Sequence, residues 1–149
     1  MSDYKVFNCT VDDAAGLAKC NMTSFYQEPS WNIMWKHTTL DFLIQNTTNR
    51  LPKNLLTERG VRRHQKVVHV PSDTIVGYVK WILPESAQNE WLEAQVPDVN
   101  NHDHKRFAEQ HRKTTFDPQQ LPEISDEHYN EWKEKHGPNG PHISKCGSV

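Results

Sequence analysis

The hydrophobic positions at the start of the chain change from a strand pattern to a helical one. Residues 4–10 (YKVFNCT) are rich in β-forming residues and alternate in part, which predicts a first strand. In residues 11–25, apolar residues recur at helical spacing after an acidic residue, Asp12 or Asp13, that can cap a helix. The pattern therefore predicts a strand followed by an amphipathic helix.

A second helical pattern runs through residues 31–51, where aromatic and aliphatic residues share one face. Ser30 can cap this helix, and the threonines within the pattern lower its helix propensity, so we expect breaks. Pro52 suits the first turn of a further helix that carries Leu55 and Leu56. At least two helices are thus predicted after the first one.

A β-hairpin is predicted next. Residues 65–70 (QKVVHV) and 75–83 (IVGYVKWIL) read as strands, and the tetrapeptide PSDT between them favours a turn. Both faces of the segment 75–83 are largely apolar. We therefore expect residues 75–83 to form a central strand that is covered on both faces.

The chain becomes more polar after Pro84. Apolar residues number 36 in residues 1–84 but 16 in residues 85–149, and the net charge changes from +3 to -5. Only short helices are predicted there, over residues 86–94, from Asn101 or Asp103 to Lys113, and over 125–136. We expect an α+β domain over residues 1–95, followed over residues 96–149 by a polar tail that is mainly helical or irregular.

Charge and cysteine content exclude several classes of protein. A sequence pI near 6.5 argues against a nucleic-acid-binding domain. The basic run RGVRRHQK (59–66) is interpreted as the cationic end of a helix, with a phosphate contact as the alternative. Three cysteines without a C-x-x-C pattern favour reduced thiols in the cytoplasm, and no targeting or membrane-spanning segment is recognised.

Three segments, LAKCNMTSFYQEPSWNIMW (17–35), LPKNLLTERGVRRHQKVV (51–68) and IVGYVKWILPES (75–86), together resemble a known family. They are similar to the N-terminal half of fungal small-molecule acetyltransferases of the GCN5-related N-acetyltransferase (GNAT) superfamily, over residues 4–95. The resemblance implies a GNAT-like partial fold, in the order strand, helix, helix, β-hairpin. In that family the helices after the first strand form a wall of the acceptor-substrate pocket. The resemblance places four aromatic residues near this pocket: Phe25, Tyr26, Trp31 and Trp35. The alternative is that they simply pack in the core.

The family's coenzyme A site has no counterpart in this sequence. In that family, the strand that follows the hairpin leads to an Arg/Gln-x-x-Gly-x-Gly/Ala loop, whose backbone N–H groups hold the pyrophosphate of coenzyme A. No such stretch occurs here, and the late glycines, in residues 136–149, alternate with prolines that lack an N–H. We therefore expect no cofactor, with acetyl-CoA bound only if the missing half is supplied in trans, and no acetyltransferase activity from this chain by itself.

Few residues are candidates for chemistry. His64, His69 and Tyr78 lie on or beside the predicted hairpin and could act as acid or base. A zinc site is not expected, because the spacing of the histidines after residue 100 lacks the H-E-x-x-H pattern. No pattern of a nucleophilic enzyme is present.

Three hypotheses follow for the function. In the first, the chain is the truncated, acceptor-binding half of an acyltransferase. In the second, it is a small-molecule-binding module or a coenzyme A-independent enzyme with acid–base chemistry. In the third, it is an interaction protein. For the last, a sheet that stops at residue 83 leaves an open edge flanked by Val76, Tyr78 and Ile82. A second copy of the chain is the expected cover of this edge, which would give a homodimer.

Overall fold

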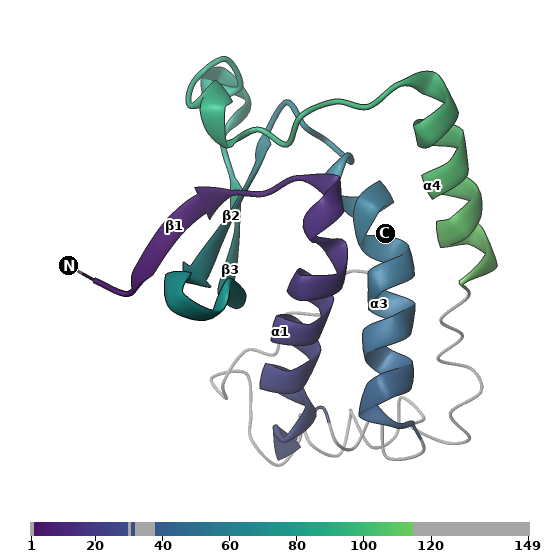
Figure 1. Cartoon of the computed structure of the whole chain (residues 1–149). Coiled ribbons are helices and arrows are strands. Elements are labelled where there is room, and N and C mark those ends of the chain that lie inside the picture. Colours follow the sequence, from purple (N-terminus) through teal and green to yellow (C-terminus); the bar gives the residue numbers. More distant parts are fainter. Residues whose placement is uncertain (1, 30, 32–37, 115–149) are drawn as a thin grey trace, which may run out of the picture. The chain divides into compact units, whose positions relative to one another are not determined.

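The computed structural model describes residues 2–29, 31 and 38–114, all within one compact unit, Met1–Phe116 (Figure 1). This part contains α-helices and a three-stranded antiparallel sheet, which confirms the expected α+β class. No described helix has the length and apolar character needed to cross a membrane. The helices and strands are β1 (Tyr4–Asn8), α1 (Ala14–Tyr26), α3 (Leu40–Leu55), β2 (Arg62–His69), β3 (Thr74–Ile82) and α4 (Asn101–Lys113).

The central strand of the sheet is β2. The strand order is β1-β2-β3, with Val6 opposite Val67 and Val67 opposite Gly77. Within the described residues β3 pairs only with β2, so the prediction that 75–83 is a central strand covered on both faces is wrong. Its two-sided apolar pattern does not correspond to burial of both faces. Ile75 and Tyr78 pack against the core, while Val76, Val79, Trp81 and Ile82 stay exposed.

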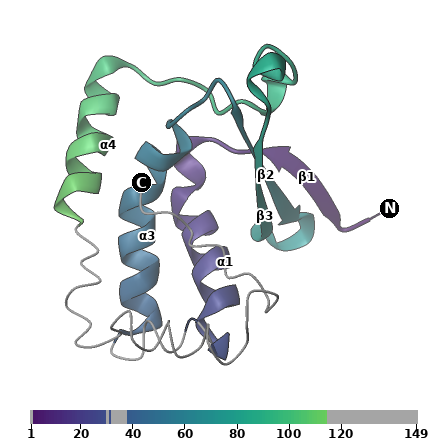
Figure 2. The same cartoon turned by 180° about the vertical axis from the view of Figure 1, so that it is seen from behind.

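The helices extend away from the sheet in the order α1, α3, α4, as Figures 1 and 2 show from opposite sides. The core between them contains four almost fully buried residues, Cys9, Leu17, Leu55 and Val96. Gly16 lets α1 approach β3 closely, because a Cβ atom at this position would lie 2.8 Å from Ile75 Cδ1. The sheet therefore buries one face against α1.

Helix α3 continues through Pro52, so the prediction that Pro52 begins a further helix is wrong. Thr39 caps α3 by accepting a hydrogen bond from the Phe42 N–H (3.2 Å). Pro52 costs the helix one backbone N–H. It is itself buried, however, and the next turn places Leu55 in the core. The expected cap Ser30 and residues 32–37 lie outside the described residues.

The basic run 59–66 does not end a helix. Helix α3 ends at Leu55, and the cationic residues from Arg62 to Lys66 belong to β2, so this interpretation is wrong. Glu58, in the intervening turn, has a left-handed backbone (φ 51°), and its side chain forms an ion pair with Arg62. The cations of β2 already have partners within the fold, since Lys66 pairs with Asp13.

After β3 the chain returns to the helices and forms α4. The helix predicted over residues 86–94 is replaced by two 3-10 turns, Glu85–Ala87 and Leu92–Ala94. Helix α4 follows as predicted, but its cap is Asn100, which accepts a hydrogen bond from the Asp103 N–H (2.9 Å). Phe107 is the buried residue of α4, which packs on α3. The helix predicted over 125–136 lies outside the described residues.

Candidate functional site

Of the three candidate acid–base residues, the structure brings two together. His64 on β2 and Tyr78 on β3 form a hydrogen bond of 2.7 Å between His64 Nδ1 and the Tyr78 hydroxyl, and their rings stack with centroids 6.0 Å apart. His64 is only 2% exposed, and within the described residues its Nε2 atom has no hydrogen-bond partner. The pair lies on the helix-covered side of the sheet, where Tyr78 packs against the core.

Burial keeps this pair neutral. It lowers the pKa of His64 to about 4, with a smaller contribution from the positive charges of Lys80 and Arg62. Burial also raises the pKa of Tyr78, and the nearby Cys9 raises it further. The Cys9 thiol is also buried, and its pKa is raised to about 12, mainly by burial. At pH 7 these three groups are therefore uncharged, which suits a packed polar contact better than an acid–base centre.

His69 lies at the opposite end of β2. Five residues separate it from His64, a distance of about 17 Å along a strand. Its Nδ1 atom lies 2.7 Å from the Ser72 hydroxyl, and its ring is 5.2 Å from that of Tyr4. His69 thus belongs to the turn between β2 and β3 and takes no part in the His64–Tyr78 contact.

Of the aromatic residues expected near an acceptor pocket, Phe25 and Tyr26 end α1 and Trp31 follows it. The rings of Phe25 and Trp31 stack with centroids 5.0 Å apart and planes inclined by 18°. The Tyr26 hydroxyl donates to the Thr38 carbonyl (3.3 Å), which links the end of α1 to the residues before α3. Trp35 lies outside the described residues. The structure therefore places three of the four residues in one region, and Phe25 is 40% exposed there.

A buried arginine holds the segment between β3 and α4. Arg63 is fully buried, and its guanidinium donates to the backbone carbonyls of Gln88, Glu90 and Trp91 at 2.8–2.9 Å. Three more carbonyls, at Arg59, Gly60 and Arg62, accept from the same group. Carbonyl oxygens thus take the place of water around this charge, so Arg63 is structural. The sequence offered no signal for this, because the carbonyls come from two separate segments, residues 59–62 and 88–91.

A groove lies between α3 and α4 and has a volume of about 340 Å³. This is near the lower end of the range for small-molecule sites. Its floor and rim come from the end of α3, the following turn and the first half of α4, through Lys53, Leu56, Thr57, His104, Lys105, Phe107 and Ala108. Sequence reasoning missed this groove, since it considered the histidines after residue 100 only as metal ligands and did not expect a zinc site.

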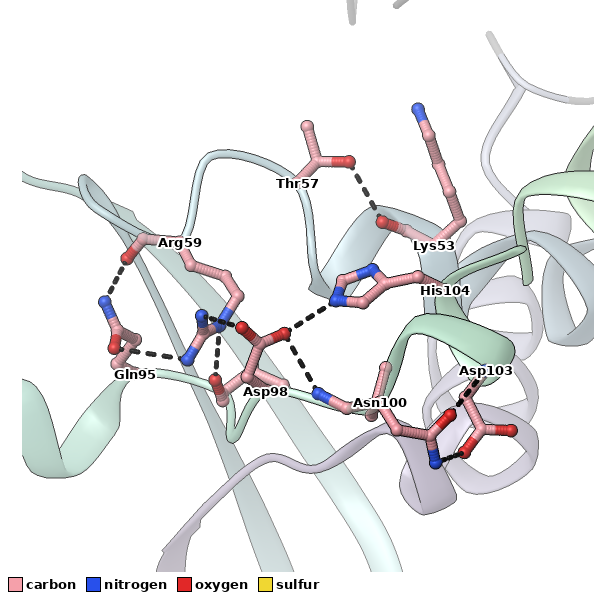
Figure 3. Close-up of polar contacts among 10 residues, drawn as sticks. Lys53, Thr57, Arg59, Gln95, Asp98, Asn100, Asp103 and His104 are labelled. Atoms are coloured by element: carbon pink, nitrogen blue, oxygen red, sulfur yellow. Dashed lines mark hydrogen bonds and ion pairs between the residues drawn. The ribbon is translucent and has the colours of Figure 1, made fainter. Parts of the chain in front are cut away.

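One side of the groove is fixed by a chain of polar contacts around Asp98 (Figure 3). Asp98 forms an ion pair with Arg59 (3.0 Å) and accepts a hydrogen bond from His104 Nε2 (2.7 Å). Arg59 is held in turn by the Val96 carbonyl (2.8 Å) and by Gln95. The hydrogen bond from His104 is the main reason that the pKa of Asp98 lies below its usual value.

Metal binding finds no support in the described residues, which contain no group of three or more His, Cys, Asp or Glu side chains arranged to hold an ion. His104 and His111, seven residues apart in α4, both lie toward α3, near Lys53. His104, however, is committed to Asp98, and His102 points to solvent with a side chain 88% exposed.

No family model, curated protein or solved structure matches this chain.

Proposed function

We propose that this chain is a GNAT-like partial domain that binds a small-molecule acceptor and does not transfer an acetyl group by itself. The observation that carries the proposal is the order β1, α1, α3, β2, β3 with an antiparallel sheet ordered β1-β2-β3. The order strand, helix, helix, β-hairpin is the one that the sequence resemblance implies for the acceptor-binding half. The stacked Phe25 and Trp31, with Tyr26 beside them, are the proposed acceptor contacts.

The sequence supports the second part of the proposal. It contains no Arg/Gln-x-x-Gly-x-Gly/Ala stretch that could present consecutive N–H groups to a pyrophosphate. The alternative of a coenzyme A-independent acid–base enzyme is less well supported, because His64 is buried, Tyr78 is partly buried, and both are uncharged at neutral pH.

Titration calorimetry with acetyl-CoA tests the absence of the coenzyme site. We expect no saturable heat with the full chain at micromolar ligand, the ordinary range of cofactor use. Saturable binding in that range would overturn the proposal.

Acceptor binding is tested with small aliphatic and aromatic amines on the ¹⁵N-labelled chain. We expect at least one amine to shift the amide signals of Phe25, Tyr26 and Trp31, and a Trp31→Leu variant to reduce the shifts. Leu92→Ala is a matched control, since Leu92 is exposed and lies on a different segment. If no amine shifts these signals, the acceptor assignment fails.

A second candidate function, an interaction module, is favoured by the edge of the sheet. We infer that β3 pairs with the β3 strand of a second copy about a two-fold axis. In the described residues its outer edge has no partner, and Val76, Trp81 and Ile82 are 48%, 47% and 67% exposed. Tyr78 was expected to flank this edge, but it packs against the core and bonds to His64.

Light scattering of the full chain tests this association. We expect twice the mass of one 17.4 kDa chain, and an Ile82→Lys variant should shift the mass toward a monomer. Val70→Lys is the matched control, because Val70 is 44% exposed but lies in the turn beyond the strands. A wild-type chain that stays monomeric at high concentration would contradict the inference.

A further inference from the structure

The groove between α3 and α4 carries positive charge that its surroundings do not neutralise. Within the described residues, Lys53 on α3 and Lys105 on α4 form no ion pair. The other cations of α4 do: Arg106 pairs with Asp103, and both Arg112 and Lys113 pair with Glu109. The two lysines of the groove are therefore the ones available to an external anion.

The nearby acids do not compensate these lysines. Asp98 is engaged by Arg59 and His104, and Asp103 is engaged by Arg106 and by the cap of α4. Arg50 also has no ion pair in the described residues and adds to the positive field. Accordingly, the pKa of His111 is lowered, first by burial and then by the charges of Arg50 and Lys53.

The floor of the groove is apolar and is built from both helices. Phe107 is buried against α3, and Leu56 and Ala108 complete the surface. An apolar floor beneath a cationic rim fits a ligand with an apolar body and an anionic head. A neutral polar ligand would leave the lysines without partners, and a bare inorganic anion would leave the floor in water.

The rim is held in place before any ligand binds. Because His104 Nε2 donates to Asp98, the His104 ring is fixed in position as part of the groove wall. The Thr57 hydroxyl donates to the Lys53 carbonyl (2.9 Å), which fixes the turn after α3 (Figure 3). A preorganised rim loses little freedom on binding.

We propose that this groove binds a small amphipathic organic anion, with its carboxylate or phosphate head on Lys53 and Lys105 and its apolar chain on Leu56, Phe107 and Ala108. The proposal is independent of the acyltransferase resemblance, which covers residues 4–95 and does not include α4. The site is also separate from the proposed acceptor contacts at Phe25, Tyr26 and Trp31.

Octanoate and octyl phosphate are suitable probes, with octanol as the uncharged control. On the ¹⁵N-labelled full chain, we expect both anions to shift amide signals at residues 53–57 and 104–108, with a Kd of about 1 mM or tighter. Octanol should bind at least roughly tenfold more weakly, since it lacks the charge. The tighter of the two anions identifies the preferred head group.

Substitutions separate a specific site from general hydrophobic binding. Lys105→Gln should weaken octanoate binding roughly tenfold, the usual effect of losing one charge-assisted hydrogen bond. Ala108→Glu should weaken it at least as much, because Ala108 is exposed and the new carboxylate would face the anion. Ala108→Gln keeps the size without the charge and should bind more tightly than Ala108→Glu.

Lys113→Gln is the matched control for lysine loss, since Lys113 also lies on α4 but pairs with Glu109. It should leave the Kd unchanged. Three results would each overturn the proposal: no groove shifts up to about 10 mM, ten times the expected Kd; octanol binding as tightly as octanoate; or equal effects of Lys105→Gln and Lys113→Gln. Shifts at Phe25 and Trp31 instead would point to the proposed acceptor contacts.

Discussion

Two neighbouring residues of β2, Arg63 and His64, are the only buried polar or charged side chains among the described residues. As consecutive strand residues they point to opposite faces of the sheet. Arg63 contacts the segment before α4, and His64 contacts Tyr78 under the helices. The guanidinium is fully hydrogen-bonded through six carbonyls, whereas the imidazole keeps one nitrogen without a described partner. These differences predict different responses to substitution and pH.

Replacing Arg63 should destabilise the fold strongly. In Arg63→Met six backbone carbonyls lose the donor that they share, and we expect the free energy of unfolding to fall by about 3 kcal/mol or more. Urea denaturation measures the change. Arg112→Met, at a side chain 72% exposed, should change it by no more than about 0.5 kcal/mol. Equal effects of the two substitutions would contradict the structural role of Arg63.

The stability of the fold should fall as the pH drops from 6.5 to 4. The pKa of His64 is about 4 in the folded chain and 6.5 when exposed, so in this window the unfolded state binds more protons. Full protonation would cost about 3 kcal/mol by this linkage. Urea denaturation at a series of pH values should show a shallower slope for His64→Gln than for the wild type.

His102→Gln provides the control for this pH series, because His102 is exposed and should leave the slope unchanged. Parallel curves for the wild type and His64→Gln would show that His64 does not supply the dependence.

At the scale of elements, the contact between α1 and β3 depends on a glycine. Gly16 faces Ile75, and a larger residue would push the flexible end of that side chain away. The helix propensity of glycine is poor, so its place in α1 is explained by this close approach. The packing of helix on sheet therefore depends on one small residue opposite one large residue.

Gly16→Val should cost about 1–3 kcal/mol through overpacking. In an Ile75→Ala background the same change should cost less, because the space is already free. A double-mutant cycle by chemical denaturation measures this coupling. Gly60→Ala is the control, since a Cβ atom there meets only Gln88 Oε1 at an ordinary 3.5 Å. Additive effects of Gly16→Val and Ile75→Ala would show that the two side chains do not compete for space.

At the scale of the whole molecule, residues far along the chain complete the core. Val96 is 1% exposed within the central cluster, and Phe107 is 8% exposed where α4 meets α3. Arg59 adds a hydrogen bond to the Val96 carbonyl. The first 95 residues thus depend on contacts that come after them.

Two shortened chains test this dependence. We expect a variant that ends at Phe116 to unfold cooperatively in urea, because it keeps the whole compact unit. A variant that ends at Gln95 should be less stable by about 3 kcal/mol or more, since the loss of Phe107 alone is of that order. Equal stability of the two chains would place the domain boundary at residue 95, as the sequence predicts.

The local pattern of the sequence was sufficient for the type and order of most elements. The alternation and spacing of apolar residues predicted β1, α1 and the hairpin, because period 2 and period 3.6 are set by neighbouring residues alone. Capping residues predicted α4. The same reasoning selected His64 and Tyr78 as polar residues of the hairpin, and the register, in which His64 is opposite Lys80, makes them diagonal neighbours that share a hydrogen bond.

Only the tertiary structure decided which strand is central, whether Pro52 ends a helix, and what surrounds Arg63. A strand with two apolar faces looks the same in sequence whether it lies in the middle of a sheet or at its edge, because pairing depends on segments elsewhere in the chain. The carbonyls around Arg63 and the two walls of the α3–α4 groove likewise come from segments tens of residues apart. Contacts of this range depend on how elements pack, and a local pattern of polar and apolar residues carries no information about them.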